Sequence, residues 1–168
     1  MPTGELTIRA TAMPADTNPY GGVFGGWLMA QMALGAGSLA SRVGQGKAVV
    51  VSATDFAFPG AMAVGDELSV YCDILATGTT SMTIAAEAIA RERNGEATQT
   101  VARGTFKFVL IGDDGRPRTG LGCRVARRRP RMIPEPLPPL LRGLGTLLIL
   151  LTSALVVTVE RRDNAERA

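Results

Sequence analysis

The chain has 168 residues, of which 46% are apolar, 5% are aromatic and none is histidine. This composition predicts one globular domain with its own core and about forty residues to spare. The lack of histidine excludes Ser-His-Asp and Cys-His nucleophilic systems, histidine metal sites and a histidine general base. Acid–base catalysis near neutral pH therefore requires a carboxylate.

The net charge of +3 is unevenly distributed along the chain. Residues 1–120 carry nine Lys and Arg against eleven Asp and Glu, a net charge of −2, whereas residues 121–168 carry nine against four, a net charge of +5. The first 120 residues contain no basic stripe with interleaved aromatics, so we expect no nucleic-acid partner. Two cysteines, Cys72 and Cys123, cannot form a disulfide framework or a zinc site. We expect reduced thiols, no metal, no leader peptide and a cytoplasmic protein.

The first elements alternate in type. Residues 5–12 alternate apolar and polar side chains, which predicts a half-buried strand. Residues 13–22 are rich in Pro, Asn and Gly and predict turns. From Gly25 to about Val43 the pattern predicts a helix that is apolar almost all round, which is typical of a buried helix. Its small residues indicate close approach to neighbouring backbone.

Strands are predicted for the rest of the domain. The Asn94-Gly95 dipeptide between the last two runs is a strong hairpin signal. The sequence thus predicts an α+β protein in which one antiparallel sheet wraps around a central helix. Because such a sheet leaves an exposed edge and face, we expect dimerisation. The four β-rich runs cover residues 48–58, 66–76, 80–92 and 97–111.

The C-terminal third has a different composition. We place the domain boundary at 1–120 and divide the extension into a basic, proline-rich linker (121–142), an apolar helix (143–160) and a charged tail (161–168). As a helix, the 17 uncharged residues 143–159 would span about 26 Å, the lower limit for a membrane anchor. The alternatives are a helix packed on another subunit and a segment with no selected role.

The helix start at Gly25 and Gly26 is the main candidate for chemistry. Neither GGVFGG nor GQGKA meets the requirements of a phosphate-binding loop. Free N–H groups at a glycine-opened helix start, together with the helix dipole, can stabilise an oxyanion. The alternative is that these glycines only allow tight packing of a strand on the helix.

Three segments resemble the hotdog-fold acyl-CoA thioesterases of the YciA type: PADTNPYGGVFGGWLMAQM (14–32), AVGDELSVYCDILATGTTSMTI (63–84) and FKFV (106–109). The resemblance extends over roughly residues 4–118. It implies a hotdog fold, homodimers assembled into hexamers as trimers of dimers, and active sites between subunits. It also implies hydrolysis of acyl-CoA thioesters without a cofactor. The extension from residue 121 has no counterpart in this family.

The resemblance implies roles for three residues. It also shows that two aspartates common in the family are replaced in this chain. It implies that Asn18 lies at the thioester and that the amides of Gly25 and Gly26 contact the carbonyl oxygen. Where the family pattern FGGWLMxQMD has an aspartate that serves as general base or nucleophile, this chain has Ala33. Where an aspartate is also common, it has Gly22.

Asp55 is our candidate for the replacement base. It lies in an otherwise apolar strand, and a lone buried aspartate is costly unless it is paired or functional. Family members often carry an acid at the position of Thr54, so Asp55 would point to the opposite sheet face unless a bulge intervenes. A structurally satisfied Asp55 is the alternative. Asp16 is expected to make local hydrogen bonds and Asp66 to cap a turn.

Candidate substrate-binding residues lie elsewhere in the chain. Thr79, Thr80 and Ser81 match a family loop near the acyl-CoA site, the alternative being a plain strand start. Arg116 and Arg118 could contact CoA phosphates, the alternative being surface solvation.

We predict an acyl-CoA thioesterase of fatty-acid metabolism. The rival is a non-catalytic acyl-CoA binding or assembly subunit that kept the pocket and lost the base. A third reading is a membrane-tethered thioesterase-like protein anchored through residues 143–160.

Overall fold

A computed structural model describes residues 3–119 of the chain. The element order is β1 (Glu5–Thr11), a 3-10 turn (Pro14–Asp16), α1 (Gly25–Gly44), β2 (Ala48–Ala57), β3 (Glu67–Thr77), β4 (Ser81–Arg91) and β5 (Thr98–Leu110). The predicted strands and helix are all present, and each of their ends lies within one residue of the predicted one. The linker, apolar segment and tail predicted for 121–168 lie outside the described residues.

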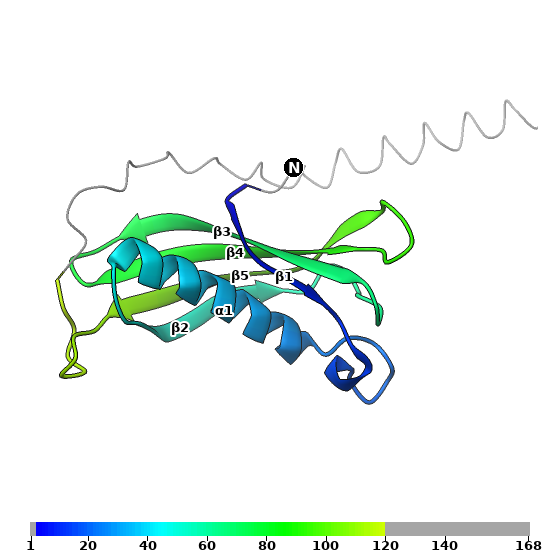
Figure 1. Cartoon of the computed structure of the whole chain (residues 1–168), viewed down its shortest axis with the longest axis horizontal. Helices are drawn as coiled ribbons and strands as arrows, with labels where there is room; N and C mark the ends of the chain where they lie inside the picture. The colour runs from blue at the N-terminus through cyan, green and yellow to red at the C-terminus, as the bar shows by residue number, and fades with distance from the viewer. Residues whose placement is uncertain (1–2, 120–168) are drawn as a thin grey trace, which may run out of the picture. The chain divides into compact units, whose positions relative to one another are not determined.

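The five strands form one antiparallel sheet in the order β1-β3-β4-β5-β2, and α1 lies across one of its faces (Figure 1). The predicted hairpin at Asn94-Gly95 joins β4 to β5. Strand β2 is the edge next to β5, and every residue from Val49 to Asp55 is exposed. The predicted open edge is therefore confirmed.

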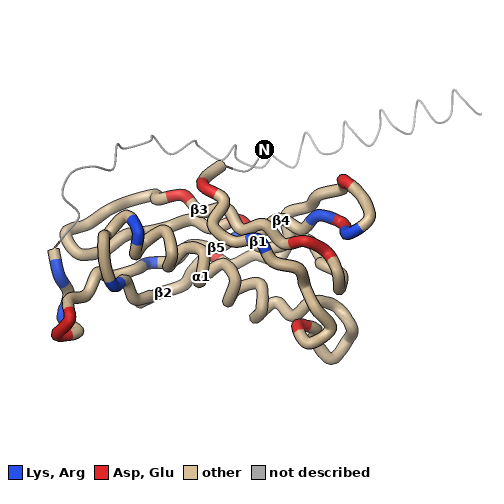
Figure 2. The backbone as a smooth tube through the Cα atoms, viewed as in Figure 1, with Lys and Arg blue, Asp and Glu red and all other residues tan. Residues whose placement is uncertain are grey.

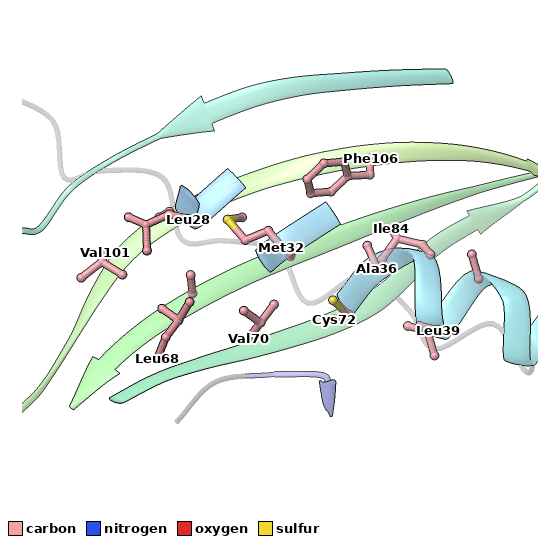
Figure 3. Packing of buried hydrophobic residues seen from close by; sticks show 14 of the residues in the cluster. Leu28, Met32, Ala36, Leu39, Leu68, Val70, Cys72, Ile84, Val101 and Phe106 are labelled. Atoms are coloured by element: carbon pink, nitrogen blue, oxygen red, sulfur yellow. The ribbon is translucent and has the colours of Figure 1, made fainter. Parts of the chain in front are cut away.

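The core lies between α1 and the inner face of the sheet. Leu28, Met32, Ala36 and Leu39 recur at helical spacing and pack on buried residues of the strands (Figure 3). Two glycines let the helix approach the sheet, because a Cβ at Gly35 would collide with Thr7 and one at Gly44 with Leu110. Close approach through small residues is thus confirmed.

The prediction of an all-round buried helix is wrong for the single chain. Ala30 and Leu34 on the outer side of α1 are exposed, and the Leu34 side chain is 60% accessible. The helix is apolar on most of its sides, as the pattern indicates, but the sheet of one chain covers only one of them. Within residues 3–119, no helix combines the length and hydropathy required to cross a membrane.

Candidate active site

The loop before α1 is organised by Asn18. Its side-chain Oδ1 accepts hydrogen bonds from the backbone N–H groups of Tyr20 (2.8 Å) and Gly22 (3.3 Å). The Asn18 backbone N–H donates to the Gly22 carbonyl at 2.7 Å, which closes the turn. The Nδ2 amino group donates to no acceptor among the described residues, so it is free to bind a ligand.

The helix start adds two further donors. Phe24 occupies the N-cap position without a side-chain cap, and its carbonyl accepts from the N–H groups of Trp27 (2.9 Å) and Leu28 (3.3 Å). The N–H groups of Gly25 and Gly26 have no acceptor within residues 3–119. Because these amides lie at the positive end of a 20-residue helix, they favour an anion or a polarised carbonyl oxygen.

The two glycines differ in how closely aromatic rings approach them. A Cβ at Gly26 would collide with the Phe24 ring, and a Cβ at Gly25 would lie 3.5 Å from the Phe58 ring. A side chain at Gly26 would therefore require the exposed Phe24 ring to move, whereas the separation at Gly25 is ordinary van der Waals contact. The packing and oxyanion interpretations of this glycine pair are compatible, because aromatic rings lie against the glycines while the amides remain free.

Asp55 lies in a β-bulge of β2. Thr54 pairs with Thr105 and Ala57 with Arg103, so Asp55 and Phe56 together oppose one residue of β5. Asp55 has φ 57°, a left-handed conformation that aspartate tolerates better than most residues. The bulge removes the strict alternation that would have placed Asp55 on the face opposite Thr54.

The Asp55 carboxylate is accessible and has one local partner. Thr54 Oγ1 donates to Asp55 Oδ2 at 3.0 Å, and Asp55 is exposed in the single chain. No hydrogen bond or ion pair within residues 3–119 connects Asp55 to Asn18 or to the helix start. The Asp55 side chain is thus exposed in the single chain, and its hydrogen bond among residues 3–119 is the one from its neighbour Thr54.

The other acids of the motif regions are used structurally. Asp16 Oδ2 accepts from the Met13 N–H at 2.8 Å, and Asp66 accepts from the N–H groups of Ala63 and Arg93. Glu87 accepts from Thr100 Oγ1 (3.0 Å) and from Arg103 Nε (3.1 Å). The local roles expected for Asp16 and Asp66 are confirmed.

The predicted substrate-binding residues lie at the opposite end of α1. Thr80 accepts from the Leu110 N–H at 2.8 Å, and Leu110 is the residue that packs on Gly44 at the helix C-terminus. Arg118 Nη2 donates to the carbonyls of Gly44 (2.6 Å) and Gln45 (3.1 Å). Arg118 therefore caps the helix, a role that the sequence did not reveal.

The remaining residues of this end are more open. Thr79 is exposed, Ser81 begins β4 opposite Val109, and the exposed Arg116 side chain has no partner among the described residues. Lys47 pairs with Asp113 at 2.9 Å. In Figure 2 the backbone at this end carries the colours of basic and acidic residues, whereas the first turns of α1 contain no charged residue. A 20-residue helix is about 30 Å long, so within one chain the two groups of candidates are far apart.

Two other chemistries find no support in the described part of the chain. No group of three or more His, Cys, Asp or Glu side chains within residues 3–119 could hold a metal ion. Cys72 is buried in the core, and burial raises the pKa of its thiol, a shift that the hydrogen bond from Thr7 opposes. A buried, protonated thiol is a poor nucleophile.

Comparison with known proteins supplies a family. Residues 20–97 match the model of the thioesterase superfamily. An uncharacterized acyl-CoA thioester hydrolase of Zymomonas mobilis is 43% identical over 69% of this chain and 78% of the relative. The acyl-CoA thioester hydrolase YciA of Escherichia coli is 38% identical over 70% of this chain and 92% of the relative.

A solved structure resembles the fold. The crystal structure of a hexameric thioesterase from Yersinia pestis superimposes with a TM-score of 0.68. It is 39% identical in sequence, and the match covers 71% of this chain and 97% of that one.

Proposed function

The chain belongs to the acyl-CoA thioester hydrolases of the YciA type, within the thioesterase superfamily, and from this premise we propose that it hydrolyses acyl-CoA thioesters to a carboxylic acid and free CoA. The observation that carries the proposal is a set of three free donors, two at the start of α1 and one in the loop that precedes it. The amides of Gly25 and Gly26 and the Nδ2 of Asn18 are unpaired within residues 3–119, where a thioester carbonyl would supply the acceptor.

The reaction needs only groups that the chain possesses. The two glycine amides polarise the carbonyl and stabilise the oxyanion of the tetrahedral intermediate. Asn18 positions the thioester or the attacking water through Nδ2. Asp55 takes a proton from that water as its oxygen bonds to the carbonyl carbon. The C–S bond then breaks, and the proton passes from Asp55 to the departing CoA sulfur.

The assembly we propose is a homodimer, or a hexamer made of such dimers. The open β2 edge exposes Val49, Val50 and Val51, and a second copy can pair with it in antiparallel orientation. The related Yersinia pestis thioesterase is hexameric. In such an assembly the helix start of one subunit can lie near the loop end of another, which would bring together residues that are far apart in one chain.

Thr79, Thr80, Ser81 and Arg116 are proposed to bind the CoA portion from the neighbouring subunit. Their hydroxyl and guanidinium groups suit phosphate oxygens. Arg118 is expected to contribute less to CoA binding, because its guanidinium already donates to the carbonyl of Gly44 at the end of α1. We also propose a cytoplasmic location, which the free, buried thiol of Cys72 fits.

A non-catalytic acyl-CoA binding subunit is the second candidate. The observation that favours it is Ala33, which is partly buried against the core, so α1 carries no carboxylate at all. This candidate keeps the same binding site and differs only in turnover.

The test measures turnover and binding on the same protein. Release of CoA from a panel of acyl-CoAs is followed with a thiol reagent, and CoA affinity is measured by calorimetry. We expect both turnover and binding. Binding without turnover above the uncatalysed rate would establish the second candidate, and the absence of both at millimolar ligand would overturn the two together.

A further inference from the structure

The phenylalanine rings of this chain form a row that leads from the core to the start of α1. Aromatic residues are scarce, yet all five phenylalanines lie in or beside a single row that ends at the helix start. Phe108 and Phe106 have ring centroids 6.3 Å apart, Phe106 and Phe56 5.3 Å, and Phe56 and Phe58 6.4 Å. The Phe58 ring then lies against Gly25.

The row passes from the core to the surface. Phe106 and Phe108 are 2% and 4% exposed, Phe56 is half-buried, and Phe58 is 47% exposed. The fifth phenylalanine, Phe24, is 55% exposed and lies against Gly26. Two accessible rings therefore flank the two free amides.

Because the two rings lie against Gly25 and Gly26, a group that covers the rings would also lie close to the free amides of these residues. Buried N–H groups without acceptors are strongly unfavourable, so whatever covers the rings must bring an acceptor to Gly25 and Gly26. The acyl group of a thioester meets both needs, because its carbonyl oxygen meets the amides while its carbon chain continues from the same atom.

The distribution of charged residues around the helix start disfavours acyl groups that end in a carboxylate. No charged residue occurs between Asp16 and Arg42. Arg103, opposite Ala57 on the neighbouring strand, is already paired with Glu87 at 3.1 Å. A second carboxylate at the end of an acyl chain would find no free cation here among the described residues, and Asp55 would repel it.

We propose that Phe24 and Phe58 are specificity-determining residues that bind the acyl chain and select uncharged, apolar acyl groups over acyl groups that end in a carboxylate. The proposal rests on the proposed function, since it assigns the rings to the acyl half of that same site. Apolar contact of this kind increases affinity by up to about fourfold for each methylene that is fully buried.

The test uses non-hydrolysable ketone analogues, S-(2-oxoalkyl)-CoA, with four, six and eight carbons in the acyl replacement, together with one that ends in a carboxylate. Calorimetry on the full chain should give a two- to fourfold gain in affinity per added methylene and weak binding of the carboxylate analogue. Phe58→Ala and Phe24→Ala should flatten this dependence on chain length, and Phe58→Leu should restore part of it.

Leu75→Ala is the matched control, because Leu75 is similarly exposed, at 49%, and belongs to β3 near the opposite end of the sheet. It should leave the dependence unchanged. The proposal would be overturned if both phenylalanine variants kept the wild-type dependence of affinity on chain length, or if they weakened binding equally at every length. Loss of oligomers without a change in this dependence would overturn it as well. If Phe58→Ala fails to fold, Phe24→Ala and Phe58→Leu decide the question. Failure of the wild-type protein to bind CoA or any analogue would instead refute the proposed function.

Discussion

Asp55 concentrates two unusual properties in one residue, an accessible carboxylate and a left-handed backbone. Such a conformation costs a non-glycine residue about 1–2 kcal/mol, and strained positions cluster at functional sites. The local hydrogen bond from Thr54 holds the carboxylate but leaves its second oxygen without a partner among the described residues. The position is thus suited to a base that must accept a proton.

Asp55→Asn should reduce kcat by about 10²–10⁴-fold while the affinity for CoA stays unchanged. Asparagine has nearly the same shape and also tolerates the left-handed region, so folding should not suffer. Steady-state kinetics and calorimetry measure the two quantities. Asp73→Asn, on β3, is the control and should behave as wild type. An unaltered kcat in Asp55→Asn would remove Asp55 from the mechanism.

Ala33 is the second residue that bears on turnover. It follows Gly26 by two helical turns and so lies on the same side of α1. Ala33→Asp should increase the hydrolysis of acyl-CoA, because it places a carboxylate on the helix that carries the free amides. Leu34→Asp puts the same charge on the neighbouring, exposed position and should give no increase. A folded, CoA-binding Ala33→Asp protein without any gain would show that the site has been rebuilt around another base.

At the scale of elements, α1 and β2 are each left half-covered. The helix buries Leu28, Met32, Ala36 and Leu39 but exposes Leu34, and β2 pairs with β5 on one side only. An apolar edge strand with free backbone groups readily pairs with another chain. A second copy of the chain that covered both the outer side of α1 and the free edge of β2 would account for the exposure of both surfaces.

Val49→Lys combined with Val51→Lys should shift the protein from oligomer to monomer, because two charges would have to be desolvated at the paired edge. Light scattering coupled to size-exclusion chromatography gives the mass directly. Turnover should fall with the oligomer if the site lies between subunits. Val64→Lys, in an exposed loop, is the control. A fully oligomeric double variant would assign the subunit interface to another surface.

At the scale of the whole molecule, the chain combines a slightly acidic domain with a basic extension. Residues 3–119 contain one helix and five strands that share a continuous hydrophobic core. Nothing in the pattern of residues 1–120 requires a second helix to complete that core.

Deletion of residues 121–168 should therefore leave the melting temperature and the affinity for CoA nearly unchanged. Differential scanning fluorimetry and calorimetry on the full and shortened chains make the comparison. Partition of the full chain between soluble and membrane fractions tests the anchor. A shortened chain that melts many degrees earlier would make the extension part of the fold.

The sequence by itself determined the types of the elements and their order along the chain, including a helix that opens on two glycines and a sheet with an exposed edge. These follow from local periodicity and from residue types with few conformational options, such as Asn94-Gly95 in its hairpin. The long motif around Asn18 determined the family.

Only the tertiary structure decided how the candidate residues are distributed. The bulge at Asp55 depends on the register between β2 and β5, and no local pattern encodes that register. The cap that Arg118 makes joins residues 73 and 74 positions apart in the chain. The meeting of Phe58 with Gly25 likewise depends on how a strand packs on a helix. Contacts of this kind form between distant segments, so they are properties of the packing and not of any one stretch of sequence.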